Sequence, residues 1–152
     1  DLCKNKPVFI FHLAQTVLKF KPPTNIFSKL GSASASEESQ TFDVKKIIFP
    51  VVSYSRLHAM KEQVTETNSM ERLDKLVAKE IIDDALAEEI RHSFNFLVKL
   101  RFQAQLKNIS EDQSPGNNVH AEMLSEEDKN QLKKAFSTVT DLQTKTGFEF
   151  KG

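Results

Sequence analysis

The segment that most constrains the fold runs from Phe94 to Leu106, with the sequence FNFLVKLRFQAQL. Together with Ile90, its residues Phe94, Leu97, Arg101 and Gln105 recur at helical spacing, so they form one stripe on a helix. A stripe of this kind faces a core or a partner. An arginine within it needs a fixed acceptor, because an unpaired buried charge costs several kcal/mol. The segment is therefore either a specific polar joint inside a helical bundle or part of a binding surface.

Four other segments also carry apolar residues at helical spacing. The predicted helices are residues 7–20, 41–66, 69–80, 84–108 and 125–147. Asn68 with Glu71, and Ser125 with Asp128, have the spacing of capping boxes, and Asp83 is a candidate N-cap for the long fourth helix. Gly147 marks the expected end of the last helix.

The segment from Thr41 is ambiguous at its start, because its β-branched and aromatic residues also suit a strand. The spacing of Ile48, Val52, Ser55 and Ala59 fits a helix better, so we interpret the segment as helical. Pro50 would then kink the helix or begin its main part.

These patterns predict an all-α fold, a helical bundle of about five helices with two long ones. The Ser-rich run at residues 32–40 predicts a flexible loop. We expect one domain at residues 7–150, preceded at residues 1–6 by the tail of another domain or a linker. The chain begins without an initiator Met, which suggests a piece of a longer polypeptide.

Composition argues against several functional classes. Lys plus Arg and Asp plus Glu both number 21, so nucleic-acid binding driven by overall charge is not expected. The single cysteine, Cys3, provides neither a disulfide framework nor a thiolate metal cluster. No apolar run approaches the roughly 20 residues that span a bilayer, and no signal peptide is recognisable, so we expect a cytoplasmic protein.

Catalytic chemistry has little support in the sequence. The four histidines fall on different predicted elements, and none has a second histidine or a carboxylate at metal-site spacing. The sequence contains no Gly-rich phosphate-binding loop, and its Ser, His and Asp residues show no pattern that indicates a catalytic triad. We expect no enzyme activity, metal or cofactor in this chain alone.

Three arginines, Arg56, Arg72 and Arg101, lie on predicted helices that could converge. In one interpretation each pairs with an acid such as Asp43 or Asp74 to fix helix register. In the other they form an anion pocket, because guanidinium groups match phosphate oxygens in pairs.

Asp43 and Lys45 directly follow the Ser-rich run. They are either a helix cap and a solvated lysine, or the edge of a cleft that this run closes. The candidate substrate-binding residues are Asp43, Lys45, Arg56, Arg101 and Gln105.

The order of several segments resembles the family of nucleotidyltransferase substrate-binding domains. The resembling segments are FDVKKIIFPVVSYSR at 42–56, MERL at 70–73, FLVKLRFQAQL at 96–106, PGNNV at 115–119 and LSEEDKNQLKKAFSTVTDLQ at 124–143. In this family the domain is found at the C-terminus of bacterial signalling proteins that also carry cyclic-nucleotide-binding, CBS and nucleotidyltransferase domains. The resemblance extends from about Pro7 to Phe150.

The resemblance implies a non-catalytic, all-helical accessory domain that binds or presents the acceptor substrate to an upstream nucleotidyltransferase domain of the same polypeptide. It also implies Mg²⁺ and a nucleoside triphosphate for the full-length protein, and it leaves open a protein as the acceptor. The Gly-Ser turn and paired aspartates of the catalytic domain are absent here. Asp83-Asp84 is adjacent in sequence but is expected to cap a helix.

Other functional classes also fit some features of the sequence. A helical interaction or dimerisation module that regulates the upstream domains would expose an apolar patch and form homodimers. A helical nucleic-acid binder and a stand-alone enzyme have less support in the residues.

Overall fold

The computed structural model describes residues 7–26 and 40–151. Five α-helices dominate this part of the chain: α1 (Pro7–Lys19), α3 (Val44–Lys61), α4 (Ser69–Ala78), α5 (Asp84–Ser110) and α6 (Glu126–Glu149). Two short strands, β1 (Thr41–Asp43) and β2 (Asn118–His120), and a 3₁₀ turn, η2 (Ala121–Met123), complete the described elements. The expected all-α bundle is confirmed. Most of the Ser-rich run and residues 1–6 lie outside the described residues.

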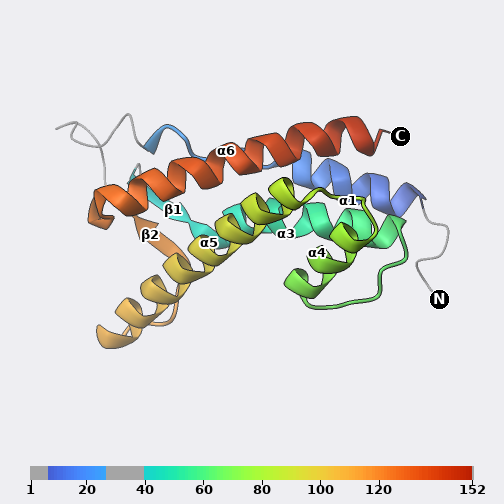
Figure 1. The fold of residues 1–152 in the computed structure, drawn as a ribbon. Coiled ribbons are helices and arrows are strands. Elements are labelled where there is room, and N and C mark those ends of the chain that lie inside the picture. The colour runs from blue at the N-terminus through green and yellow to red at the C-terminus, as the bar shows by residue number, and fades with distance from the viewer. Residues whose placement is uncertain (1–6, 27–39, 152) are drawn as a thin grey trace.

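Helix α3 lies at the centre of the bundle and packs against α1, α4, α5 and α6 (Figure 1). Its fully buried residues include Ile47, Val51 and Leu57. The main core joins α3 to α4, α5, α6 and the two strands, and a smaller cluster under α1 contains Val17, Leu57 and Phe150.

Polar side chains determine where the helices begin. Asn68 Oδ1 accepts from the backbone N–H groups of Met70 and Glu71, at 2.8 and 3.3 Å. Asp83 Oδ1 accepts from Leu86 N at 2.8 Å, and Ser125 Oγ from Asp128 N at 3.0 Å. Each bond satisfies a donor that has no partner within its helix. All three predicted N-caps are therefore confirmed.

The prediction of helix for the whole segment from Thr41 was wrong at its start. Thr41–Asp43 forms β1, which pairs antiparallel with β2, and Phe42 lies opposite Val119. Both of these side chains are buried. The helix begins at Val44 and continues through the buried Pro50 to Lys61.

The last helix also differs from its expected end, because α6 continues past Gly147 to Glu149. In Figure 1, α6 spans the length of the molecule antiparallel to α1, and the C-terminal half of α5 projects away from it. That half carries the exposed side chains of Phe102, Leu106 and Ile109. Within the described residues, no helix combines the length and apolarity needed to cross a membrane.

Candidate functional site

The β1–β2 ribbon positions the start of α3 beside the C-terminal half of α5. Asn117, just before β2, makes both connections. Its backbone carbonyl accepts from Val44 N at 3.0 Å, and its side-chain oxygen accepts from Arg101 Nε at 2.8 Å. We call this part of the molecule the ribbon end: β1, β2, Val44, Lys45, Asn117 and residues 101–108 of α5.

Arg101 is half-buried at the ribbon end, and its hydrogen-bond partner is an amide rather than a carboxylate. No ion pair to Arg101 occurs among residues 7–26 and 40–151. An amide oxygen orients the guanidinium group without neutralising it, so the positive charge is available to an anion. Of the two interpretations of Arg101, an internal ion pair is therefore not the arrangement observed.

Four of the five predicted site residues belong to the ribbon end. Asp43 caps α3, with its Oδ1 accepting from Lys45 N at 2.9 Å, and the Lys45 side chain is exposed. Gln105 follows Arg101 by one turn of α5 and is half-buried. The structure thus places Asp43, Lys45, Arg101 and Gln105 around one joint.

Arg56 lies apart from this group. It follows Val44 by about 18 Å along the axis of α3, at the helical rise of about 1.5 Å per residue. Its exposed guanidinium group is close enough to Arg72 to act on it electrostatically. The expected convergence of three arginines is therefore limited to Arg56 and Arg72.

Arg72 is buried, and its Nη2 donates to the backbone carbonyls of Glu66 and Thr67 at 2.9 and 3.2 Å. Burial lowers the pKa of this guanidinium, and the charge of Arg56 lowers it further. Asp74, an acid considered as a partner for these arginines, instead binds Arg91 at 2.9 Å.

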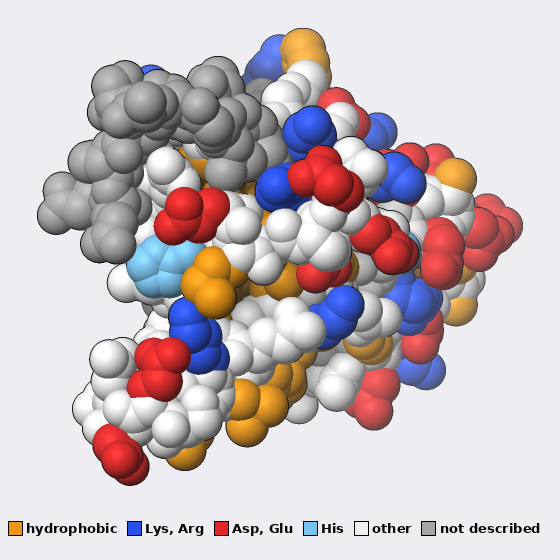
Figure 2. Space-filling view, turned by 90° about the vertical axis from the view of Figure 1, so that its left-hand side faces the viewer, with side chains coloured by type: hydrophobic (Ala, Val, Ile, Leu, Met, Phe, Trp, Pro, Cys, Tyr) orange, Lys and Arg blue, Asp and Glu red, His pale blue; other side chains and the backbone are white. Residues whose placement is uncertain are grey.

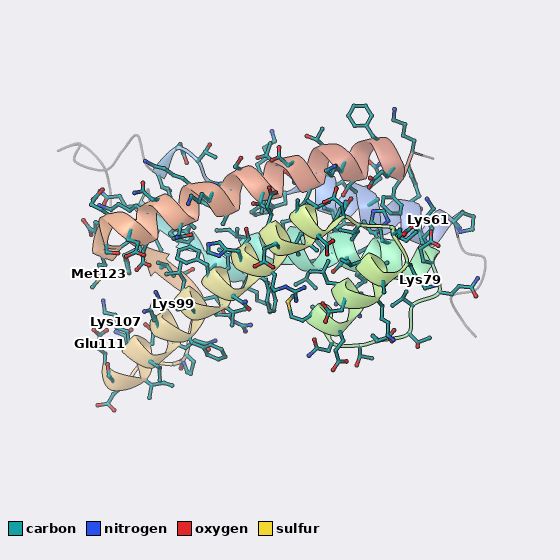
Figure 3. The ribbon with its side chains drawn as sticks, in the orientation of Figure 1. Lys61, Lys79, Lys99, Lys107, Glu111 and Met123 are labelled. Carbon is teal, nitrogen blue, oxygen red and sulfur yellow. The ribbon has the colours of Figure 1, made fainter. Side chains whose placement is uncertain are left out.

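A cleft of about 570 Å³ adjoins the ribbon end, between the C-terminal half of α5 and the segment from β2 to the start of α6. Its polar lining residues include Gln103, Lys107, Asn118, His120 and Asp128. Lys107 and Glu111 of α5 face Met123 across the cleft, with Lys99 further along the same helix (Figure 3). A cleft of this volume suits a small molecule or part of a larger one.

Polar contacts between neighbouring elements shape the walls of this cleft. Lys99 Nζ lies 3.5 Å from Asp128 Oδ1, joining α5 to α6. Thr41 Oγ1 and His120 Nδ1 lie 3.0 Å apart across the ribbon. Figure 2 views this end of the molecule and shows acidic and basic side chains intermingled over it, with apolar side chains exposed among them. The surface is thus mixed in charge rather than uniformly basic.

A second groove of about 570 Å³ lies between the N-terminal half of α5 and α6. Three carboxylates line it, those of Glu88, Glu89 and Asp141. None of the five predicted site residues lines this groove or the cleft beside the ribbon end. We take the ribbon end as the candidate site because an oriented cation and four predicted residues belong to it.

Sequence reasoning missed a polar network at the far end of the bundle. Glu149 Oε2 accepts from Tyr54 Oη at 3.1 Å and lies 3.0 Å from His58 Nε2. Burial lowers the pKa of His58, although the nearby Glu149 carboxylate opposes this effect, and burial raises the pKa of Tyr54 above its usual range. Glu149 lies more than 90 positions after Tyr54 and His58 in the sequence, so no spacing signal could have found the network.

Within the described ranges, no group of three or more His, Cys, Asp and Glu side chains is arranged to hold a metal ion.

Comparison with protein families gives one match. Residues 7–150 match the family described as a putative nucleotidyltransferase substrate binding domain. No significant match was found among curated proteins or solved structures.

Proposed function

The chain belongs to the family of nucleotidyltransferase substrate-binding domains, and we propose that it holds the acceptor substrate for a nucleotidyltransferase domain of the same polypeptide. The main observation behind this proposal is that the guanidinium group of Arg101 donates to the neutral amide of Asn117, beside a polar cleft. A fixed cation whose charge is not internally neutralised suits recognition of an anionic group.

The chemistry of the ribbon end favours a substrate with one anionic group and several hydrogen-bonding groups. Arg101, with the ammonium of Lys45 at the start of α3, would bind the phosphate or carboxylate. The amides of Gln103 and Asn118, which line the adjoining cleft, would bind the polar remainder. Few but well-placed polar groups commonly determine orientation in such sites.

We propose that catalysis takes place on the other domain, with Mg²⁺ and a nucleoside triphosphate. The pair of adjacent aspartates in this sequence, Asp83 and Asp84, supports the assignment of catalysis to the other domain. Asp83 is engaged as the N-cap of α5 through its bond to Leu86 N, so its carboxylate already has a structural role. A cytoplasmic signalling protein of bacteria, with CBS or cyclic-nucleotide-binding domains upstream, is the setting that we propose.

The proposal is tested by a transfer assay on the polypeptide that joins this chain to its nucleotidyltransferase domain. The reaction contains Mg²⁺, an α-labelled nucleoside triphosphate and a cell extract as the source of acceptor. We expect Arg101→Gln to raise the extract concentration needed for half-maximal labelling by about tenfold, the loss of one charge-assisted contact of about 1.4 kcal/mol. The KM for the triphosphate should not change.

The matched control is Arg91→Gln. Arg91 lies on the same helix and is also half-buried, but it is paired with Asp74 and Glu88. This variant should leave the acceptor requirement unchanged. An effect of Arg101→Gln on the triphosphate KM alone would place Arg101 in a different role.

A second candidate function has its own observation. Phe102, Leu106 and Ile109 are 60%, 65% and 55% exposed, and their spacing places them on one face of α5. Such a stripe is typical of helix-to-helix association, so the alternative is a homodimerisation module. Leu106→Lys should then convert a dimer to a monomer in a sizing experiment. A wild-type chain that is monomeric at high concentration would contradict this alternative.

A further inference from the structure

A cavity of about 430 Å³ lies between the first turns of α1 and the last residues of α6. Figure 1 shows these two segments at the end of the bundle opposite the ribbon end. Its walls are mainly apolar and include Val8, Ile10, Phe11 and Phe150. Val8 is 66% exposed, so apolar surface continues from the cavity to its rim. Clefts of this volume with mainly apolar walls are typical binding sites for small molecules.

Two of the residues that line this cavity are lysines, and the ammonium group of each lies over a phenyl ring. Lys61 Nζ is 5.7 Å from the ring centroid of Phe150, and Lys151 Nζ is 4.8 Å from that of Phe148. Both lysines line the cavity, and within residues 7–26 and 40–151 neither is ion-paired with a carboxylate. Figure 3 shows Lys61 at this end of the molecule. Within the described residues, an anionic group would therefore compete with these ring contacts and not with an ion pair for the two ammonium groups.

Among the described residues that line the cavity, Glu149 has the one carboxylate, and it is already engaged. Glu149 Oε2 accepts from Tyr54 Oη and lies 3.0 Å from His58 Nε2, and both partners are buried behind it. Hydrogen bonds of this kind disperse the charge of the carboxylate, although the Glu149 side chain is 36% exposed. The lining residues therefore carry an excess of one positive charge.

The start of α1 adds to this positive potential. The first N–H groups of a helix lack intrahelical acceptors, and the helix dipole places partial positive charge there. Helices α4, α5 and α6 carry acidic residues in their first turn, whereas α1 has none. The positive end of α1 is thus not offset by its own side chains.

We propose that this cavity binds an amphiphile with an apolar body and a single anionic head group. The body lies against Ile10, Phe11 and Phe150, and the head group lies between the ammonium groups of Lys61 and Lys151. This site is separate from the ribbon end and does not depend on the function proposed for it.

The test uses three probes with the same ten-carbon chain: decanoate, decanol and decylamine. Binding to the chain is followed by isothermal titration calorimetry, below the concentrations at which the probes aggregate. We expect decanoate to bind more tightly than decanol by about fivefold and decylamine to bind most weakly, because partly exposed charge pairs contribute about 1 kcal/mol. Equal or tighter binding of decylamine would overturn the proposal.

Lysine substitutions test whether decanoate binds at this cavity. The double variant Lys61→Gln, Lys151→Gln should reduce decanoate binding to the level of decanol and leave decanol unaffected. Its control is Lys79→Gln, which removes an exposed lysine just after α4, outside the lining of the cavity (Figure 3). Both surface variants are expected to fold, so this comparison alone decides the role of the charges. Unchanged decanoate binding by the double variant would overturn the proposal.

A cavity-filling variant tests the apolar part. Ile10→Trp should weaken decanoate and decanol alike, at least tenfold. Phe102→Ser removes an exposed apolar side chain of α5 and should change neither, which separates the cavity from other apolar surface. If Phe102→Ser abolished binding while Ile10→Trp preserved it, the site would lie on α5 instead.

Discussion

At the scale of single residues, Asn117 joins β2, α3 and α5 through two hydrogen bonds, one from Val44 N and one from Arg101 Nε. The backbone bond is independent of the side chain, so the two connections can be tested separately. Arg101 is oriented only through the side-chain amide among the described contacts. The chemistry of the ribbon end therefore depends on one neutral acceptor.

A double-mutant cycle tests this contact. Asn117→Ala and Arg101→Gln should each lower the free energy of unfolding by about 1 kcal/mol, and the double variant should lose about as much as either alone, because both remove the same bond. Urea unfolding of the four proteins measures the coupling. Strictly additive losses would mean that the two side chains do not meet in solution.

His58 makes stability depend on pH. Burial lowers its pKa in the folded state despite the facing Glu149 carboxylate, while Lys61 and Glu62 act more weakly in opposite directions. The unfolded chain therefore binds a proton at His58 more readily. The contribution of His58 to the free energy of unfolding is therefore fully present above the unfolded pKa of about 6.5, and it declines as the pH falls below that value.

We therefore expect His58→Gln to make stability less dependent on pH between about 6.5 and 5. Urea unfolding of both proteins at several pH values measures this difference. A constant gap between wild type and variant across this range would show that His58 does not titrate differently on folding.

At the scale of elements, α5 combines two environments. Its N-terminal half packs in the core, and its C-terminal half exposes one face while lining the cleft with another. The apolar stripe from Ile90 to Leu97 correctly predicted the buried face, since both residues are at most 1% exposed.

Two leucine substitutions on α5 contrast these environments. Leu97 is fully buried, so Leu97→Ala should cost about 2–5 kcal/mol, whereas Leu106 is 65% exposed and Leu106→Ala should stay within about 0.5 kcal/mol. Denaturant unfolding of both variants measures these losses. Similar losses would mean that the projecting half of α5 is covered in solution.

Whether an element could be predicted depended on how far apart in the sequence its contacting residues lie. The caps at Asn68, Asp83 and Ser125 were predictable, because each involves residues two or three positions apart. The strand β1 was not, because its partner β2 lies more than 70 residues later and a three-residue strand has almost no periodicity. Extension of α6 past Gly147 depends on tertiary packing, where the glycine lies against Leu18 of α1.

The candidate site was predictable only in part, for the same reason. Helical spacing marked Arg101 as a side chain that needs an acceptor, but Asn117 lies on a loop 16 residues away and gave no such signal. Arg56 was grouped with Arg101 from residue type, and the length of α3 separates them. The network of Tyr54, His58 and Glu149 depends on the packing of α6 against α3, which brings together residues far apart in the sequence.

At the scale of the whole molecule, the bundle presents two different ends. The ribbon end carries an oriented guanidinium group beside a polar cleft, and the opposite end carries an apolar cavity edged by two lysines. We propose that the first end serves the nucleotidyltransferase reaction and that the second binds an amphiphile. The long helices α5 and α6 hold these ends apart, so a ligand at one need not exclude a ligand at the other.

The central claim is that the acceptor substrate lies at the ribbon end. It is tested most directly by placing the photo-crosslinking residue p-benzoylphenylalanine at Gln103, in the polar cleft, or at Glu88, in the acidic groove of the same helix. The joined polypeptide is irradiated during transfer of an α-labelled nucleotide to acceptors in a cell extract. We predict that labelled acceptor is crosslinked from position 103 and not from position 88. Label captured from position 88 alone would contradict the account.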